Sequence, residues 1–175
     1  FIFWLLGIAN IVFDLVCTRL ITLARPDLAL ISECCLTILY LLQVLVPVSL
    51  LSYIRTYYES DQSWPRWRRV CCVIPPLLMS LFILLNHRNG LFFRIDNSGN
   101  YVRGPYYLCM YLFAGAYILV IAVSSHVYAS QLGRQKVRAI RELLLLVGIC
   151  VVIQSIYHDI LLTGFGIAMC IAILF

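Results

Sequence analysis

The sequence predicts an all-α protein: a polytopic bundle of transmembrane helices, six spans of an expected seven, with a short extracellular β-hairpin. Hydrophobic residues make up 63% of the 175 residues, and charged residues only 12%. A soluble domain has about 45–50% and about 25%, respectively. A globule of this size cannot hide so much apolar surface from water, so a bilayer must act as solvent for most of the chain.

Six apolar segments are separated by short polar connectors. Each full segment is long enough, at about 20 residues, to cross the hydrocarbon core, and none alternates as a barrel strand would. We expect helices over residues 1–24, 28–54, 70–86, 106–129, 142–157 and 158–175. Because both ends lie inside apolar runs, we expect residues 1–175 to be a single transmembrane domain truncated at both ends. One more span would precede Phe1, and an output domain would follow Phe175.

Basic residues are distributed unevenly among the connectors. The connectors 55–69 and 129–142 together hold eight arginines and lysines, whereas those on the opposite side hold four. The richer side is normally cytoplasmic, which places the carboxyl end in the cytoplasm. Basic residues grouped in this way match membrane topology better than nucleic-acid binding. The expected partner is therefore the lipid bilayer, with no nucleic acid.

Polar residues inside a span are costly and need a reason. Asn10, Asp14 and Cys17 follow i, i+4, i+7 spacing and share one helix face, which we expect to face the bundle interior. Asp14 would lie about 18 Å below the turn at Pro26. It could be neutral, paired with a neighbour, or part of a binding pocket. We treat Asn10 and Asp14 as candidate ligand-sensing residues.

Arg19 and Glu33 are also candidate ligand-sensing residues. Each is seven residues from Pro26, so in an antiparallel pair of helices both would lie about 10 Å below the turn. We hypothesise that they form an ion pair; the alternative is that each side chain reaches the interface separately. Deeper in the same helix as Glu33, Pro47 should deprive the Gln43 carbonyl of its donor and kink the helix, either as a hinge or as a static bend.

The connector 87–105 is the most informative stretch. Residues 91–95 and 101–103 favour strands, and residues 96–100 form a turn cluster with a glycine, which predicts a β-hairpin capping the outer mouth of the bundle. The hairpin could close over a ligand, with Arg94 or Arg103 meeting an anion. Alternatively, it only seals the bundle.

No catalytic or metal-binding set is present. The sequence has no nucleophile elbow, phosphate-binding loop or H-E-x-x-H string, and its three histidines lack metal-ligand spacing. None of the eight cysteines forms a C-x-x-C pair. We therefore expect no metal and no cofactor in this region. If the parent protein is an enzyme, its catalytic residues lie outside this chain.

The hairpin also carries a family resemblance. Residues 93–105 read F-R-I-D-N-S-G-N-Y-V-R-G-P, which resembles the outer-loop signature of the seven-span N-terminal region found in bacterial histidine kinases and GGDEF-type diguanylate cyclases. The residues that match this motif are Asp96, Gly99, Tyr101, Arg103, Gly104 and Pro105. Gln154, followed by an apolar run, resembles a second landmark.

The resemblance implies a sensor and signal-transducing region in the bacterial inner membrane. Its output would be synthesis of cyclic di-GMP or phosphorylation of a histidine, and such outputs imply a homodimer. The sequence does not identify the stimulus, for which a small ligand is one candidate. The alternative is a small transporter or an accessory membrane subunit. A transporter should show an internal repeat and a mid-membrane site made by broken helices, and we find neither. A reading frame that stopped directly after Phe175 would favour this alternative.

Overall fold

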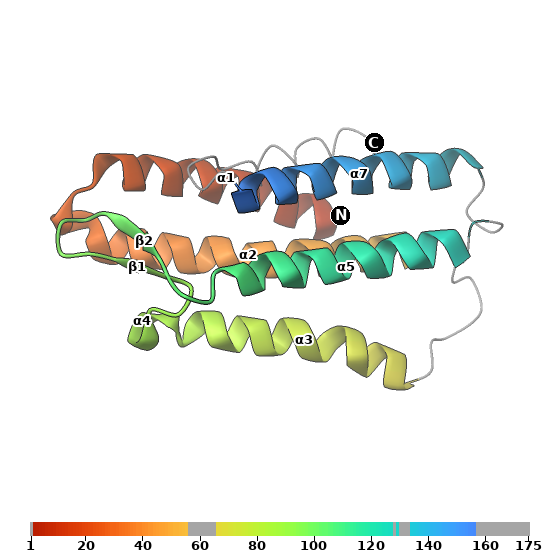
Figure 1. The fold of residues 1–175 in the computed structure, drawn as a ribbon, viewed down its shortest axis with the longest axis horizontal. Helices are drawn as coiled ribbons and strands as arrows, with labels where there is room; N and C mark the ends of the chain where they lie inside the picture. Colours follow the sequence, from red (N-terminus) through yellow and green to blue (C-terminus); the bar gives the residue numbers. More distant parts are fainter. Residues whose placement is uncertain (1, 56–65, 128, 130–133, 157–175) are drawn as a thin grey trace.

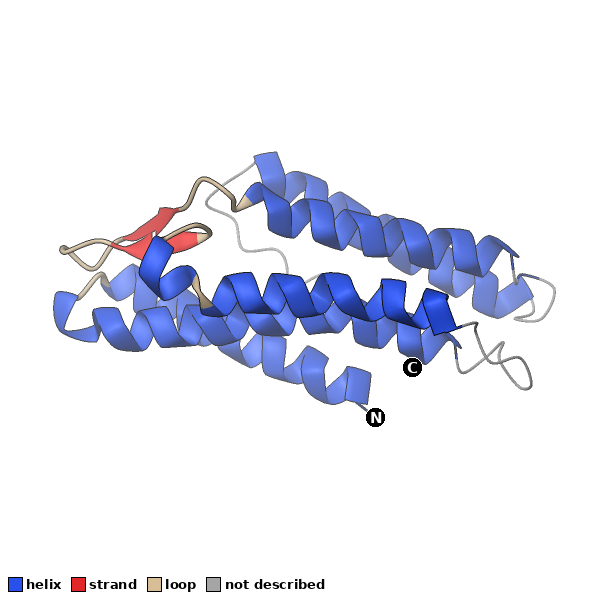
Figure 2. Ribbon diagram, turned by 90° about the horizontal axis from the view of Figure 1, so that it is seen from below, coloured by secondary structure: helices blue, strands red, loops and turns tan. Residues whose placement is uncertain are grey.

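The protein is a bundle of long helices with a small β-sheet at one end (Figures 1 and 2). The computed structural model describes residues 2–55, 66–127, 129 and 134–156, with the backbone alone for residues 66–69, 71, 134, 136, 154 and 155. The long helices are α1 (Ile2–Leu23), α2 (Ala29–Arg55), α3 (Arg66–Leu84), α5 (Leu108–Val127) and α7 (Arg134–Ile156). A 3-10 turn, η1 (Pro26–Leu28), joins α1 to α2, and the short helix α4 (Asn86–Asn89) follows α3.

Three of the described helical stretches are long and apolar enough to cross a membrane. They are Ile2–Leu23, Pro26–Arg55 and Leu108–Val127, while α3 contains a shorter apolar stretch, Cys72–Leu84. Large apolar side chains cover their outer surfaces, as lipid contact requires. The sixth predicted segment lies outside the described residues, so the count of six spans stays a prediction.

The helix ends that flank the two basic connectors lie at the same end of the bundle. The end of α2, the start of α3, the end of α5 and the start of α7 all lie opposite the β-sheet (Figure 1). This arrangement agrees with the grouping of basic residues in the sequence. That this end is cytoplasmic, and that the sheet is extracellular, stay predictions.

The last described helix begins earlier than its apolar segment. We expected a start at Glu142, whereas α7 begins at Arg134. Hydropathy marks only the part of a helix that lies in lipid. Arginine, lysine, glutamine and alanine are all good helix formers, so the helix also includes the basic residues before the apolar segment.

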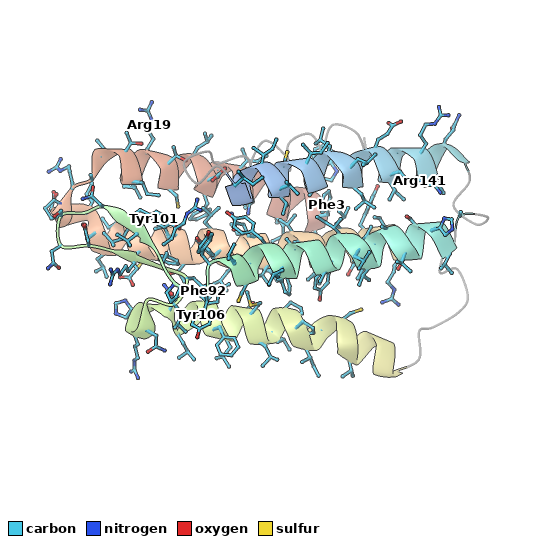
Figure 3. All side chains as sticks on the ribbon, viewed as in Figure 1. Phe3, Arg19, Phe92, Tyr101, Tyr106 and Arg141 are labelled. Carbon is cyan, nitrogen blue, oxygen red and sulfur yellow. The ribbon has the colours of Figure 1, made fainter. Side chains whose placement is uncertain are left out.

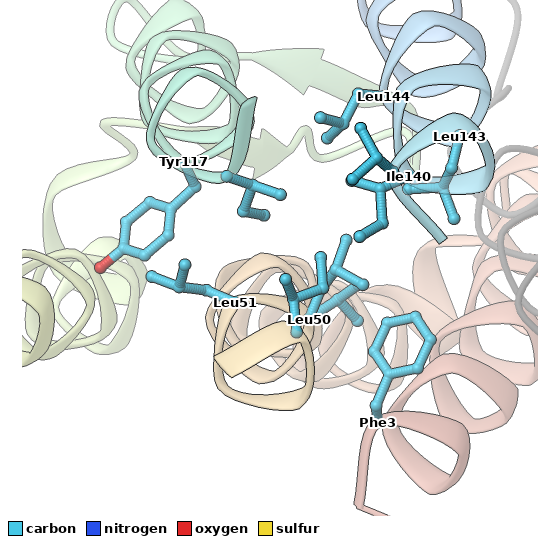
Figure 4. Close-up of a cluster of buried hydrophobic side chains, with 11 residues drawn as sticks. Phe3, Leu50, Leu51, Tyr117, Ile140, Leu143 and Leu144 are labelled. Carbon is cyan, nitrogen blue, oxygen red and sulfur yellow. The ribbon is translucent and has the colours of Figure 1, made fainter. Parts of the chain in front are cut away.

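Two clusters of buried apolar side chains hold the helices together. The cluster far from the sheet joins α1, α2, α5 and α7 through residues such as Phe3, Leu50, Tyr117 and Leu143 (Figure 4). The cluster beside the sheet joins α1, α2, α3, the strand β1 (Phe93–Ile95) and α5. Its buried members are Cys17, Leu36, Leu39, Val44, Ile83, Phe92, Phe93 and Met110. Lipid is as apolar as leucine, so these clusters stabilise the bundle mainly by close packing.

A side chain replaces one backbone hydrogen bond that a proline removes. Pro76 lies inside α3 and has no N–H, so the carbonyl of Cys72 loses its regular helical donor. The Tyr117 hydroxyl, from α5, donates to this carbonyl at 2.6 Å. Since an unmet carbonyl in lipid is costly, this bond ties α5 to α3 at the point where α3 is weakest.

We predict that Tyr117→Phe lowers stability by about 1–3 kcal/mol, because the Cys72 carbonyl then has no donor. In a Pro76→Ala background, alanine supplies the missing N–H, so the same change should cost much less. The thermal unfolding midpoints of the four proteins in detergent measure this coupling. An equal loss in both backgrounds would contradict this explanation.

Candidate functional site

The sheet end of the bundle is closed by residues 86–105, which we call the cap. Strands β1 (Phe93–Ile95) and β2 (Tyr101–Arg103) pair antiparallel, with Phe93 opposite Arg103 and Ile95 opposite Tyr101. Phe93 is fully buried and Arg94 is exposed, as the alternation of a strand requires. The cap therefore has an apolar underside against the helices and a polar outer face.

Asp96 shapes the turn between the strands. Its Oδ1 accepts hydrogen bonds from the backbone N–H groups of Ser98 at 2.9 Å and Asn100 at 2.8 Å. The bond from the Asn100 backbone is the main cause that lowers the pKa of Asp96. The carboxylate is therefore ionised at neutral pH. It holds the turn through these hydrogen bonds while it stays accessible to water.

The turn between β1 and β2 packs against the connection between α1 and α2. Gly99 has φ +83°, a left-handed conformation that glycine adopts without strain. A Cβ at this position would lie 2.8 Å from the backbone carbonyl carbons of both Ala24 and Arg25. Only glycine allows the tip of the cap to approach the first pair of helices so closely.

Asn86, the first residue of α4, holds the chain in place where the cap begins. Its side chain is 1% exposed. The amide Nδ2 donates to the Phe93 carbonyl at 2.8 Å, and Oδ1 accepts from the Phe92 N–H at 2.7 Å. This one side chain therefore satisfies backbone groups at the start of β1. Gly90, left-handed at φ 57°, ends α4 and turns the chain into the cap.

The end of the cap is bonded directly to its beginning, where α5 starts. The N–H of Gly104 donates to the Phe92 carbonyl at 2.8 Å, and the N–H of Tyr106 donates to the Leu91 carbonyl at 2.9 Å. A Cβ at Gly104 would collide with the carbonyl oxygen of Leu91. Pro105, which follows, is exposed and has a fixed φ that suits the turn into α5.

A cluster of tyrosines around Arg103 lies beneath the cap. The hydroxyls of Tyr101 and Tyr40 are 2.9 Å apart, which links β2 to α2. The Arg103 guanidinium lies 5.0 Å from the centre of the Tyr107 ring, a cation–π distance, and Tyr111 is close to both Arg103 and Tyr101. Burial raises the pKa of Tyr101, so its phenol stays protonated.

In this cluster, a positively charged guanidinium lies beside phenol hydroxyls at the sheet end of the bundle. Phenol and guanidinium groups can donate hydrogen bonds to a carbonyl or an anion. No hydrolytic or transfer chemistry follows from these groups. Within the described part of the chain, no group of three histidine, cysteine or acidic side chains could hold a metal ion.

The predicted site residues occupy three separate places. Asn10 and Asp14 are buried on the face of α1 that also carries Cys17, as the spacing predicted. Arg94 is exposed on the cap, and Arg103 lies beneath it. Arg19 is exposed and points away from the other helices (Figure 3). The structure therefore does not bring these residues into one site.

The ion pair between Arg19 and Glu33 is not formed. Glu33 is instead bound through Oε1 to Nδ1 of His87, at 2.9 Å. The two predicted partners are at matched depth, but Arg19 lies two residues after buried Cys17. At about 100° per residue, this places Arg19 on the opposite side of α1 from the buried face.

Three residues whose side chains form hydrogen bonds in or to the cap were not found from the sequence: Tyr40, Asn86 and His87. Tyr40 is separated from Tyr101 by 61 positions, so no local spacing could connect them. Asn86 and His87 follow the apolar segment of α3 and look like ordinary interfacial residues. The only available signal was that Asn86 is a polar residue directly after the apolar segment of α3.

These features define a class of protein: a helical membrane domain closed at one end by a cap that packs against several helices. The family model described as the N-terminal 7TM region of histidine kinase matches residues 2–175. The chain therefore belongs to this family, and it is a membrane sensor region of the histidine kinase type. No curated protein and no solved structure matches the chain.

We predict that Gly104→Ala disrupts the cap. Its methyl group would need the space of the Leu91 carbonyl, and forcing atoms into a filled site costs about 1–3 kcal/mol or more. Gly115→Ala in α5 is the matched control, because a Cβ there meets nothing within 4 Å. Unfolding midpoints should fall for the first variant and be unchanged or higher for the second. Equal midpoints for both variants would contradict the tight fit at Gly104.

Proposed function

We propose that this chain is the input region of a bacterial membrane histidine kinase, and that its stimulus acts on the cap. One observation carries the proposal: the cap contacts the helices at several separate points. Gly99 lies against the α1–α2 connection, Tyr101 and His87 are hydrogen-bonded to side chains of α2, and Arg103 covers Tyr107 at the start of α5. A ligand that moved the cap would therefore move several helices together.

The route inward would run through α5 and α7. Helix α5 follows the cap directly, and its Tyr117 and Ile121 belong to the same buried cluster as Ile140, Leu143 and Leu144 of α7 (Figure 4). A ligand can shift such an arrangement only if it binds two states with different affinities. The two states would differ in how the cap is seated on the helices.

Arg103 is the residue that we propose to sense the stimulus most directly. It belongs to β2 of the cap and lies beside three tyrosines whose hydroxyls can share a bound oxygen. Exposed Arg94 would add attraction for an anion from the water side. The ligand would be a small molecule with a carbonyl or anionic group, and the region needs no cofactor of its own.

Membership of the family favours histidine phosphorylation over synthesis of cyclic di-GMP as the output. We further propose that the region lies in the bacterial inner membrane with its basic end in the cytoplasm, and that it acts as a homodimer. The charge bias between the two ends supports the orientation. The proposal of a homodimer is supported by the expected output alone, because kinases of this kind phosphorylate within a dimer.

The proposal is tested with Tyr101→Phe in the complete protein reconstituted into nanodiscs. Loss of the bond to Tyr40 should weaken the cap by about 1 kcal/mol, which corresponds to about a fivefold change in a two-state ratio. The basal rate of autophosphorylation should change by about that factor. It should rise if the arrangement with the cap seated is the inactive state, and fall if that arrangement is the active state. Tyr106→Phe is the matched control, because Tyr106 is exposed at the surface.

Unchanged basal activity and unchanged response in Tyr101→Phe would mean that the cap only seals the bundle. An absence of phosphotransfer from the unaltered complete protein would contradict the proposed output instead. The two failures are therefore distinguishable.

The orientation is tested by replacing Asn97, exposed in the cap turn, with cysteine. A membrane-impermeant maleimide added to intact spheroplasts should label Asn97→Cys but not Arg138→Cys at the other end of the bundle. The unaltered protein measures labelling of the native cysteines. Labelling of Arg138→Cys alone would reverse the proposed topology.

A further inference from the structure

Arg19 is a charged residue on the outer side of a helix that is long and apolar enough to span a membrane. Its side chain is exposed, and Figure 3 shows it pointing away from the other helices. A charge in the hydrocarbon region is costly, so arginines in membrane spans usually face the bundle interior or a polar partner. The position of Arg19 on the outer surface of α1 therefore requires a partner outside the bundle.

Arg19 continues a row of exposed apolar side chains along α1, which we call the α1 stripe. Its members follow one another at intervals of three and four residues, the spacing that places side chains on one face of a helix. Their exposed fractions are 61% for Leu5, 49% for Ile8, 51% for Val12 and 65% for Leu15. The α1 stripe is therefore an apolar surface open to acyl chains, with the guanidinium of Arg19 at its sheet end.

The depth of Arg19 suits the boundary between acyl chains and lipid headgroups. Arg19 lies four residues before α1 ends at Leu23, which is about 6 Å at about 1.5 Å per residue. An arginine side chain can extend this far while its methylene groups stay among apolar atoms. Its guanidinium can therefore reach the headgroups while the α1 stripe contacts the chains below them.

A second copy of the chain would not supply the missing negative charge. Two copies in one membrane orientation place groups of equal depth side by side, so the partner of Arg19 would have to be an exposed acid near the sheet end of a span. The acidic side chains of the described residues are buried, bonded at the sheet end, or in the half of α7 nearer the basic end: they are Asp14, Asp27, Glu33, Asp96 and Glu142. Charge complementarity therefore favours a lipid phosphate.

We propose that Arg19 and the α1 stripe bind an anionic phospholipid in the leaflet at the sheet end of the bundle. The guanidinium donates to the phosphate oxygens, for which its planar fork is well suited. One acyl chain lies along the α1 stripe. A lipid with a net negative charge is preferred over a zwitterionic one, because the site carries a single positive charge. This site uses neither the cap nor the tyrosine cluster, so it does not depend on the proposed sensor function.

The test places a tryptophan on the α1 stripe of the complete protein in nanodiscs. Lipids with brominated acyl chains quench a tryptophan that they contact. Brominated phosphatidylglycerol should compete for the site of Leu15→Trp about fivefold more strongly than brominated phosphatidylcholine, which is the effect of one basic residue at an anionic surface. Adding Arg19→Gln to this variant should remove the preference.

Two matched controls separate this site from general attraction of anionic lipid. Arg88→Gln removes another exposed arginine at the same end of the bundle, and it should leave the preference at Leu15→Trp unchanged. Leu112→Trp, at a position of α5 that is 73% exposed, should be quenched equally by the two lipids. The unaltered protein measures quenching of the native tryptophans.

Three results would overturn the proposal. The first is the absence of a preference at Leu15→Trp, or a preference that persists with Arg19→Gln. The second is an equal preference at Leu112→Trp, which would mean that anionic lipid gathers around the whole protein. The third is that neither lipid quenches Leu15→Trp, because protein rather than lipid would then cover the α1 stripe.

Discussion

The structure depends on one constraint: inside a bilayer, every backbone polar group must find its partner within the protein. Regular helices satisfy this constraint over most of the chain. It becomes demanding only where a helix is interrupted or ends. At the sheet end, backbone bonds from Gly104 and Tyr106 and the Asn86 amide satisfy such groups with partners that hold the cap in place. The same need therefore produces both stability and the geometry of the candidate sensor.

Helices α1, α2 and α5 contribute to both apolar clusters, whereas α7 joins only the far cluster and α3 supplies a buried residue only to the cluster at the sheet end. The three shared helices form a continuous frame from the cap to the basic end. The cap touches this frame at Tyr40 and Tyr107, and α7 touches it at the level of Tyr117 and Ile121. A disturbance at one end can reach the other without passing through lipid-exposed side chains.

Much of the fold was predictable, because hydropathy and spacing act locally. The apolar runs gave the long helices to within a few residues, except where α7 continues into polar sequence, and the i, i+4, i+7 pattern placed Asn10, Asp14 and Cys17 on a buried face. The pairing of Arg19 with Glu33 was wrong because depth below a turn does not define the direction around a helix. The Tyr40–Tyr101 bond was missed because it depends on tertiary packing alone.

The close seat of Gly99 on Ala24 and Arg25 has a consequence for biosynthesis. The first two helices leave the ribosome and enter the membrane well before the cap is translated. The turn between them therefore stays uncovered until α3 has formed and the strands of the cap have paired. During this interval the hairpin of α1 and α2 must persist on its own contacts, so its mature geometry is a late event of assembly.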